Sequence, residues 1–360
     1  MNREETLKLW QRCQESCAHA RAAAFSKGER GEVGPIGQDA GRDEWNRWAN
    51  ELLAERKQLE EAGEWVTQAS KWLYKASADF SAIHFLPREF GYLDPNRAVG
   101  GDAIVRSESW VTRVEPLKIY KREVGEIQYE FLEVLSDGNR IEFSGFIFPS
   151  GVILDRAEFH GPAFFERAQF HNVAFFRTAK FYKEVRFTNA RFHGSVLFAN
   201  AKFLDRTSFQ GVHFNKSAFF EGAEFLNEDM SDQIEKSISF HRALFKRIAN
   251  FKDFRCYGDA SFSQATFEDS ATFEKARFGK LADFTATKAT LAFNLSQVRF
   301  RQIPKFNQAD FKQAPDLDGI DWPMPPFFAK GEAQSIRSTV NRLKQSFSSV
   351  LYFTCSVIIA

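Results

Sequence analysis

Cysteine is scarce in this chain of 360 residues, which has only four, and no two of them form a Cys-x-x-Cys pair. Scattered cysteines of this kind indicate a reducing compartment rather than a disulfide framework. The N-terminus also lacks the apolar run of a secretory signal, because Met1–Glu5 leads directly into a charged stretch. These features predict a cytoplasmic protein.

Familiar active-site signatures are absent as well. The sequence contains no Gly-x-Ser-x-Gly, no His-Glu-x-x-His and no Walker A motif. A glycine-rich stretch from Gly28 to Gly41 follows no predicted strand and lacks a phosphate-binding lysine, so we interpret it as a loop. Cys13 and Cys17 lie one helical turn apart without further ligands nearby, which favours small core residues over a metal site. We therefore predict a non-enzymatic protein without cofactor or metal.

The charge balance argues against direct binding of nucleic acid. The formal net charge of the chain is +1. Between Phe143 and Trp322 there are 24 lysines and arginines against 21 aspartates and glutamates. A net charge of +3 over this region is too small for affinity driven by counterion release, so no nucleic-acid partner is expected.

Phenylalanine is abundant, with 41 residues, and its spacing is regular. Large apolar residues recur in alternating steps of five and six, so the true repeat is eleven residues. The first series is Phe143, Phe148, Leu154, Phe159, Phe165, Phe170, Phe176, Phe181, Phe187, Phe192, Phe198, Phe203, Phe209, Phe214, Phe220 and Phe225. A second series of sixteen positions runs from Phe240 to Trp322, so about nine residues loop out in the intervening segment 226–239.

A small residue precedes nearly every one of these positions by two, as in Ala168-Gln169-Phe170. The spacing fits neither an α-helix, which needs apolar returns every three or four residues, nor hairpins, which need turn residues between strands. It predicts a coil with four short sides, each placing one large and one small side chain inward. Cys256 and Ala289 are weaker core residues, and we expect Phe254 and Leu291 to compensate for them.

The Ala-x-Phe pattern resembles the motif of the pentapeptide-repeat family over about half of the chain. The resemblance implies a mainly β fold, a right-handed quadrilateral β-helix of about eight coils over residues 143–322. Two departures are the 22-residue coils that the six-residue steps produce and the dominance of Phe over Leu. Some members of the family are DNA mimics that bind topoisomerases, but a mimic needs an acidic rod, and this one is nearly neutral.

Three further regions complete the predicted organisation. Residues 1–76 have apolar residues at helical spacing, which predicts an α-helical N-terminal region. Residues 77–142 hold a first repeat pair, Phe80 and Phe85, followed by a strand-rich insertion that we expect to cap the first coil, with a hairpin turn at Asp137-Gly138. Residues 323–360 begin with a proline-rich stop and continue as an amphipathic and then apolar helix.

The segment 345–360 leaves three interpretations open. Its 16 uncharged residues are few for a membrane span, which needs about 20. It is a truncated or marginal membrane helix, a helix packed on the last coil, or a partner-binding tail. Since many pentapeptide-repeat proteins carry membrane helices after the solenoid, the resemblance favours the first, at the inner face of the membrane.

Two columns of outward residues are of interest, one formed by residues just before a core position and one by residues just after it. On one face, Ile153, Phe175, Leu197 and Phe219 recur every 22 residues, whereas later coils carry polar residues there. An exposed apolar row marks a contact, so either the N-terminal helices cover it or it binds a partner or a second copy of the chain. Elsewhere His171 and His193 should stack and Asn215 should continue them, which we interpret as a solvated polar ladder rather than a metal site.

These observations predict a protein-binding scaffold with an unknown protein partner, with a membrane-coupled sensor or channel accessory as the alternative function.

Overall fold

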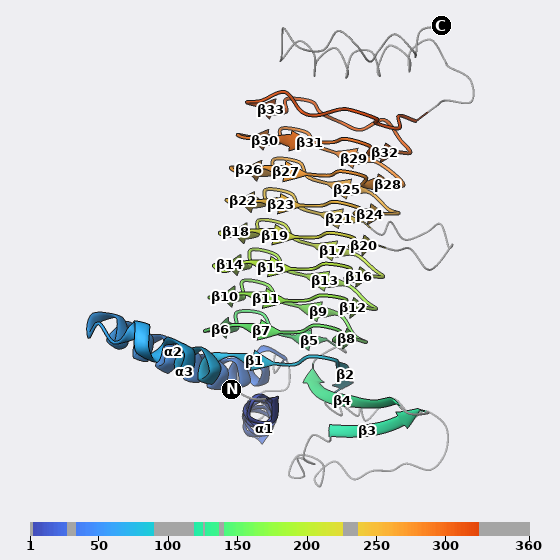
Figure 1. Cartoon of the computed structure of the whole chain (residues 1–360). Coiled ribbons are helices and arrows are strands. Elements are labelled where there is room, and N and C mark those ends of the chain that lie inside the picture. The colour runs from blue at the N-terminus through green and yellow to red at the C-terminus, as the bar shows by residue number, and fades with distance from the viewer. Residues whose placement is uncertain are drawn as a thin grey trace, which may run out of the picture.

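The computed structural model of the chain describes residues 3–26, 34–89, 119–124, 127–136, 140–225 and 237–323. It is a parallel β-solenoid with three helices at its N-terminal end (Figure 1). The predicted four-sided architecture is confirmed. The segment 345–360, the helix expected before it, the turn at Asp137-Gly138 and most of the segment 226–239 lie outside the described residues.

Each side of the solenoid is one parallel sheet, and we name the four sides faces A to D. Face A runs in the order β1 (Ala78–Asp79), β7 (Val152–Ile153), β11 (Ala174–Phe175), β15 (Val196–Leu197), β19 (Ala218–Phe219), β23 (Ala249–Asn250), β27 (Ala271–Thr272) and β31 (Phe293–Asn294). Face B runs β3 (Ile119–Val124), β4 (Ile127–Ser136), β2 (Ile83–Glu89), β8 (Glu158–Phe159), β12 (Lys180–Phe181), β16 (Lys202–Phe203), β20 (Glu224–Phe225), β24 (Arg255–Cys256), β28 (Arg277–Phe278) and β32 (Arg299–Phe300).

Faces C and D complete the coil. Face C comprises β5 (Ile141–Glu142), β9 (Ala163–Phe164), β13 (Val185–Arg186), β17 (Thr207–Ser208), β21 (Ile238–Ser239), β25 (Ala260–Ser261) and β29 (Ala282–Asp283). Face D comprises β6 (Ile147–Phe148), β10 (Gln169–Phe170), β14 (Arg191–Phe192), β18 (His213–Phe214), β22 (Leu244–Phe245), β26 (Thr266–Phe267), β30 (Lys288–Ala289) and β33 (Asp310–Phe311).

The alternating five- and six-residue steps correspond to two kinds of corner. In a five-residue step the second residue after the core position has positive φ, as at Arg167 (57°) after Phe165. The amide of Ala168 donates to the carbonyl of Phe165 at 3.1 Å, which closes a tight turn with a left-handed third residue, as in type II turns. In a six-residue step the additional residue lets the chain turn without positive φ.

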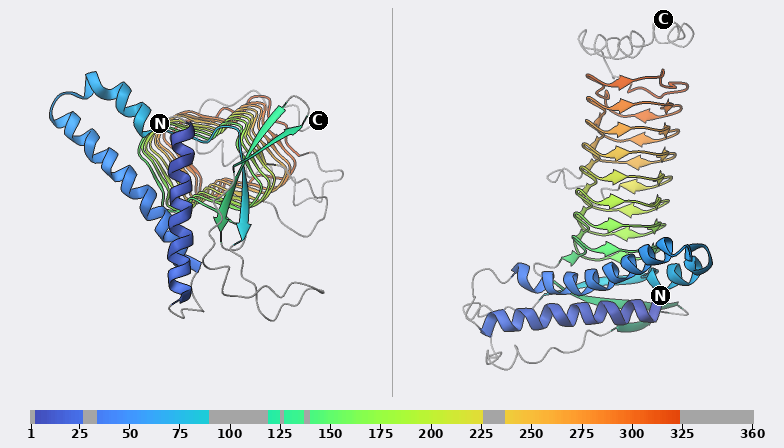
Figure 2. Two further views of the ribbon diagram at one scale, coloured as in Figure 1. Left: turned by 90° about the horizontal axis from the view of Figure 1, so that it is seen from below. Right: turned by 90° about the vertical axis from the view of Figure 1, so that its left-hand side faces the viewer.

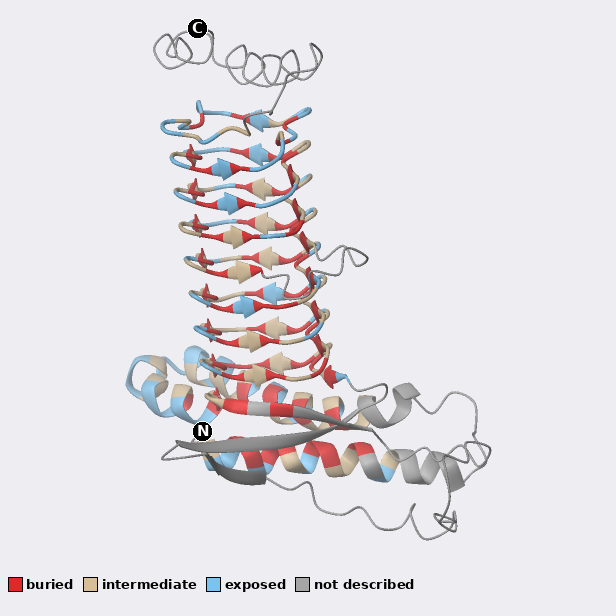
Figure 3. Cartoon of the chain, turned by 90° about the vertical axis from the view of Figure 1, so that its right-hand side faces the viewer, coloured by how far each residue is buried: buried red, intermediate tan, exposed pale blue. Residues whose placement is uncertain are grey.

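The interior is a set of stacked phenylalanine columns. Rings 22 residues apart lie nearly parallel, as in Phe165 and Phe187, whose centroids are 4.6 Å apart. The small residue two positions earlier is also buried, so each short strand alternates inward and outward (Figure 3). Aromatic burial of this kind provides a continuous core without disulfides or metal.

Two coils depart from this packing. Phe254 is fully buried, and its ring lies 5.1 Å from Phe225 and 5.9 Å from Phe278, so it fills the space that Cys256 leaves, as expected. The expectation for Ala289 was wrong, because Leu291 is 39% exposed. Phe293 compensates instead, with its ring 5.5 Å from Phe267 and 4.8 Å from Phe311.

The helices cover the N-terminal end of the core (Figure 2). They are α1 (Arg3–Ser26), α2 (Gly34–Glu61) and α3 (Trp65–Ala76). The interpretation of Gly28–Gly41 as a loop was wrong from Gly34 onward, because α2 begins there. Gly41 lies in the helix where α1 and α2 approach closely, and a Cβ at this position would be 2.6 Å from the carbonyl oxygen of Cys13.

The solenoid starts before the insertion, as the Phe80 and Phe85 repeat predicted. Ala78 pairs with Val152 and Phe85 with Phe159, so 74 residues separate partners that elsewhere lie 22 apart. Within the intervening segment, β4 pairs in parallel with β2 and antiparallel with β3. The hairpin of β3 and β4 thus extends face B beyond its first coil, where the sheet edge would otherwise be open.

Candidate functional site

The apolar column predicted from the sequence is present on face A. Ile153, Phe175, Leu197 and Phe219 occupy the outward positions of β7, β11, β15 and β19, which lie one above the other in Figure 1. Phe175 is in register with Ile153 on one side and with Leu197 on the other. All four side chains are partly exposed, whereas the residue before each of them is buried. We call these four residues the apolar column.

Polar and charged residues border the apolar column at the adjoining corner. The residues two positions later are Asp155, Arg177, Ala199 and Glu221, followed by Lys252 on the next coil. The Nε of Arg177 donates to Asp155 at 2.9 Å, and its guanidinium lies 5.2 Å from the centre of the Phe175 ring. The column is thus a narrow apolar strip with charges of both signs along one edge.

On the opposite edge, two positions earlier, small residues predominate. They are Gly151, Val173, Ser195 and Ser217, followed by Ile248, whose side chain is 47% exposed. Above Phe219 the outward position changes character, because Asn250, Thr272 and Asn294 continue the same register. The apolar surface is therefore confined to four successive coils of face A.

The tryptophans of the N-terminal helices pack elsewhere, which corrects the interpretation that they cover the column. Trp10 lies 4.8 Å from Phe143 and 5.7 Å from Phe146 between ring centroids, and Trp45 lies 5.6 Å from Phe148. The Nε1 of Trp45 also donates to the carbonyl of Ile147 at 2.8 Å. These contacts seal the interior at the first coil, because the exposed ends of the phenylalanine columns would otherwise meet water. The apolar column stays accessible.

The predicted histidine ladder is also present, at the corner between faces D and A. The rings of His171 and His193 stack with centroids 4.7 Å apart, and Nδ1 of His193 lies 3.3 Å from Nδ2 of Asn215. Burial, then His193 and then Arg56 lower the pKa of His171 to about 4. Among the residues that the structure describes, no group of three His, Cys, Asp or Glu is placed to hold a metal ion.

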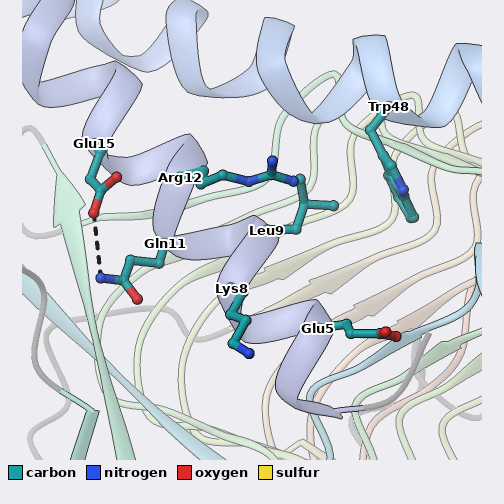
Figure 4. A pocket seen from close by; sticks show the side chains of 7 residues that line it. All are labelled: Glu5, Lys8, Leu9, Gln11, Arg12, Glu15 and Trp48. Atoms are coloured by element: carbon teal, nitrogen blue, oxygen red, sulfur yellow. Dashed lines mark hydrogen bonds between the residues drawn. The ribbon is translucent and has the colours of Figure 1, made fainter.

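The N-terminal helices line an open pocket of about 520 Å³ that the sequence did not predict (Figure 4). Its lining is Glu5, Lys8, Leu9, Gln11, Arg12, Glu15 and Trp48. These side chains include no serine, cysteine or histidine, and Gln11 donates to Glu15 at 3.4 Å. The mixed charges of α1 offer hydrogen bonds but no pairing of nucleophile and base.

The cysteines of the helices are core residues in this arrangement. Cys13 and Cys17 are buried, and burial raises the pKa of the Cys13 thiol well above its usual range. A neutral thiol of this kind is a poor nucleophile and a poor metal ligand. Within the described part of the chain, no helix is both long enough and apolar enough to cross a membrane.

The four parallel sheets and the stacked phenylalanine rings between them define a parallel β-solenoid built from short repeats. Comparison with protein-family models matches residues 154–202, 176–224 and 240–288 to the family described as pentapeptide repeats (9 copies). Residues 154–224 and 240–288 therefore carry pentapeptide repeats, as their Ala-x-Phe motifs predicted. Comparisons with curated proteins and with solved structures found no match.

Proposed function

We propose that this chain is a non-enzymatic protein-binding scaffold whose solenoid presents the apolar column as its contact surface. The observation that carries the proposal is the unbroken register of Ile153, Phe175, Leu197 and Phe219 on one face, left uncovered by the helices. Solvent-exposed apolar surface is costly unless a partner covers it, so a continuous row of this kind favours protein binding. The rigid coils hold the row in place, which reduces the entropy lost on association.

The geometry of the remaining surface agrees with a scaffold. The outward column of face B carries charged residues that pair between neighbouring coils, as Lys180 does with Glu158 at 2.9 Å. Such exposed pairs contribute little to stability but keep a surface soluble. The membrane association of residues 345–360 and the cytoplasmic location stay predictions from the sequence.

Site-specific photo-crosslinking in cells tests the proposal. A photoreactive amino acid replaces Leu197 in the apolar column or, as the matched control, Asn294 at the same outward position four coils further along face A. We expect protein adducts at position 197 that disappear when Phe175→Glu and Phe219→Glu are added. An absence of adducts at 197, or the same adducts at both positions, would overturn the assignment of this face.

A further inference from the structure

We propose that face A binds a second copy of this chain, packed antiparallel about a two-fold axis that passes through Leu197. This inference rests on the proposed function, because it takes the apolar column to be a protein contact and names the partner. In an isologous pair the same patch must complement itself. The outward residues of five successive coils meet this condition in one register.

The centre of the patch pairs apolar residues with each other. With the axis at Leu197, the coils on either side exchange partners, so Phe175 of one copy meets Phe219 of the other and Leu197 meets its own equivalent. One coil further out, Ile153 meets Asn250. The central three coils therefore bury aromatic and aliphatic side chains on both copies, as a contact core requires.

The charged edge selects this register. Arg177 of one copy lies opposite Glu221 of the other, Asp155 lies opposite Lys252, and Ala199 meets itself. Arg177 and Glu221 are both exposed, so they can reach across. Arg177 and Lys252 also keep partners within their own chain, because Arg177 donates to Asp155 and Nζ of Lys252 lies 3.2 Å from Glu274. The two-fold operation doubles each of these contacts, which gives four complementary charge pairs.

Neighbouring registers bring like charges together. An axis half a coil nearer the N-terminus sets Asp155 against Glu221, and one half a coil further along sets Arg177 against Lys252. An axis a full coil nearer the N-terminus sets Arg177 against its own equivalent. Because like charges across an interface are strongly unfavourable, the edge excludes the registers that the apolar column alone would tolerate.

The edge of small residues, from Gly151 to Ile248, is complementary to itself in shape. Ile248, which is 47% exposed, lies opposite Gly151 of the second copy. Gly151 has no side chain of its own, and a Cβ there would be in van der Waals contact with Ser77 Oγ at 3.5 Å and with the carbonyl of Val173 at 3.6 Å. At the axis Ser195 meets its equivalent, and Val173 meets Ser217. A protruding side chain therefore faces the position with the least side-chain volume.

The charged edge favours the antiparallel arrangement over a parallel one. A two-fold axis parallel to the solenoid would exchange the two edges of face A, so the charged residues of each copy would lie opposite the small residues of the other and would have no complementary charge. Five coils at about 4.8 Å each form a contact well below the roughly 800 Å² per partner of stable complexes, so we expect a weak dimer.

Sedimentation equilibrium of the purified full chain over a concentration series tests the dimer. We expect the average mass to rise from monomer toward dimer, and Phe175→Glu with Phe219→Glu to abolish the rise. Asn294→Glu, on the same face two coils beyond Asn250, is the matched control and should leave the rise in mass unchanged. The inference is overturned if the average mass stays that of a monomer at every concentration, or if Phe175→Glu with Phe219→Glu leaves dimerisation unchanged.

Charge reversal tests the register. Arg177→Glu sets two carboxylates against Glu221 and its equivalent, and Glu221→Arg sets two guanidinium groups against Arg177. We expect each variant alone to dimerise at least ~10-fold more weakly, and an equimolar mixture of the two to recover, because every opposed pair is then complementary. Thermal unfolding of each variant checks that the coil is intact. A mixture that stays as weak as its components excludes this register.

Oxidative cross-linking gives a second measurement if a charge variant fails to fold. In a Cys355→Ser background, Leu197→Cys should form a disulfide-linked dimer because the axis passes through this position, whereas Thr272→Cys should not. If position 197 captures other proteins in cells while the pure chain stays monomeric, the proposed function survives and the self-pairing is excluded. If position 197 captures nothing and the chain is monomeric, both fail.

Discussion

The coils before and after residues 226–236 share one interior but differ on the outside. Across this segment Phe225 pairs with Cys256 in register, and the four sheets continue without a change of direction. On face A, however, the outward residue changes from Phe219 to Asn250. The core therefore imposes the same requirement on every coil, whereas the surface is free to vary with what each coil contacts.

The interiors of the two halves also differ in how they meet this requirement. In the coils before the break, every central position from Phe159 to Phe225 is phenylalanine. In those after it, Cys256 and Ala289 interrupt the columns, and Phe254 and Phe293 fill the space from normally small positions. Conserved volume, rather than a fixed position for each ring, is thus the condition for packing.

The largest expected effect comes from removing a phenylalanine ring that fills the space beside a smaller core residue. Phe254→Ala removes the ring that compensates for Cys256 and leaves a cavity between Phe225 and Phe278, which should cost about 3–5 kcal/mol of unfolding free energy. Adding Cys256→Phe restores the pattern of the other coils, so the double variant should lie within about 1.5 kcal/mol of the parent. Urea unfolding followed by circular dichroism measures both.

The same ring can be moved in the opposite sense in the coils before the break, which tests the comparison between the halves. Ala201 and Phe203 occupy the equivalent positions two coils earlier on face B. Ala201→Phe with Phe203→Cys should be tolerated within the same margin, while Phe203→Cys alone should be clearly destabilised. If both double variants were as unstable as their single variants, each ring would need its own position and volume conservation would be the wrong explanation.

The corners allow a second comparison between one position in each half, with a smaller expected effect. Gly211 has φ of 64°, and a Cβ at this position would lie 2.4 Å from Oδ1 of Asn189. Gly211→Ala must adopt a left-handed conformation and displace that side chain, so we expect a loss of roughly 1–2 kcal/mol. Ala286, at the equivalent corner after the break, already has φ of 55°.

Ala286→Gly is the counterpart of that change. Glycine relieves the left-handed strain but gains freedom in the unfolded chain, so the two effects should cancel to within about 0.5 kcal/mol. Thermal unfolding of the two variants side by side measures the contrast. Equal effects at both corners would mean that positive φ is not what the glycine supplies at position 211.

Much of the fold could be predicted from the sequence because its signal is periodic. The step of five or six residues between Phe165, Phe170 and Phe176 sets the number of sides and the stacking of rings, and local packing leaves few alternatives. Leu291 was misassigned because the spacing alone did not reveal that Phe293, two residues before Leu295, points inward. The helical state of Gly34–Gly41 was missed because glycine and proline there suggest a loop, whereas close contact with α1 decides it.

The candidate site was predictable in part. The apolar column follows directly from the 22-residue register, so Ile153 and Phe219 could be placed on one face before the structure was known. The sequence could not show whether Trp10 and Trp45 cover that face, because helical periodicity defines an apolar stripe but does not identify the surface that the stripe contacts. The sequence also did not show that Arg177 and Glu221 border the apolar column, because this depends on where the edges of face A lie.

The last prediction concerns pH and compares one corner column in the two halves. His171 stacks on His193 before the break, whereas Lys246 occupies the same column after it. Burial and then His193 hold the pKa of His171 at about 4, below the ordinary histidine value near 6.5. A depressed pKa means that the folded chain binds fewer protons than the unfolded one between pH 6.5 and pH 4. The contribution of His171 to the unfolding free energy is therefore complete above pH 6.5 and is lost as the pH falls toward 4.

His171→Gln removes the titrating ring while keeping an amide that can hydrogen-bond. The fall in melting temperature from pH 7 to pH 5 should therefore be smaller in the variant than in the parent by roughly 2 °C, since a partly exposed group is screened by solvent. Lys246→Gln is the matched control and should not alter the difference between the two pH values. Identical pH dependence in His171→Gln and the parent would show that the ladder contributes nothing to acid sensitivity, and the two halves would then be equivalent at this corner.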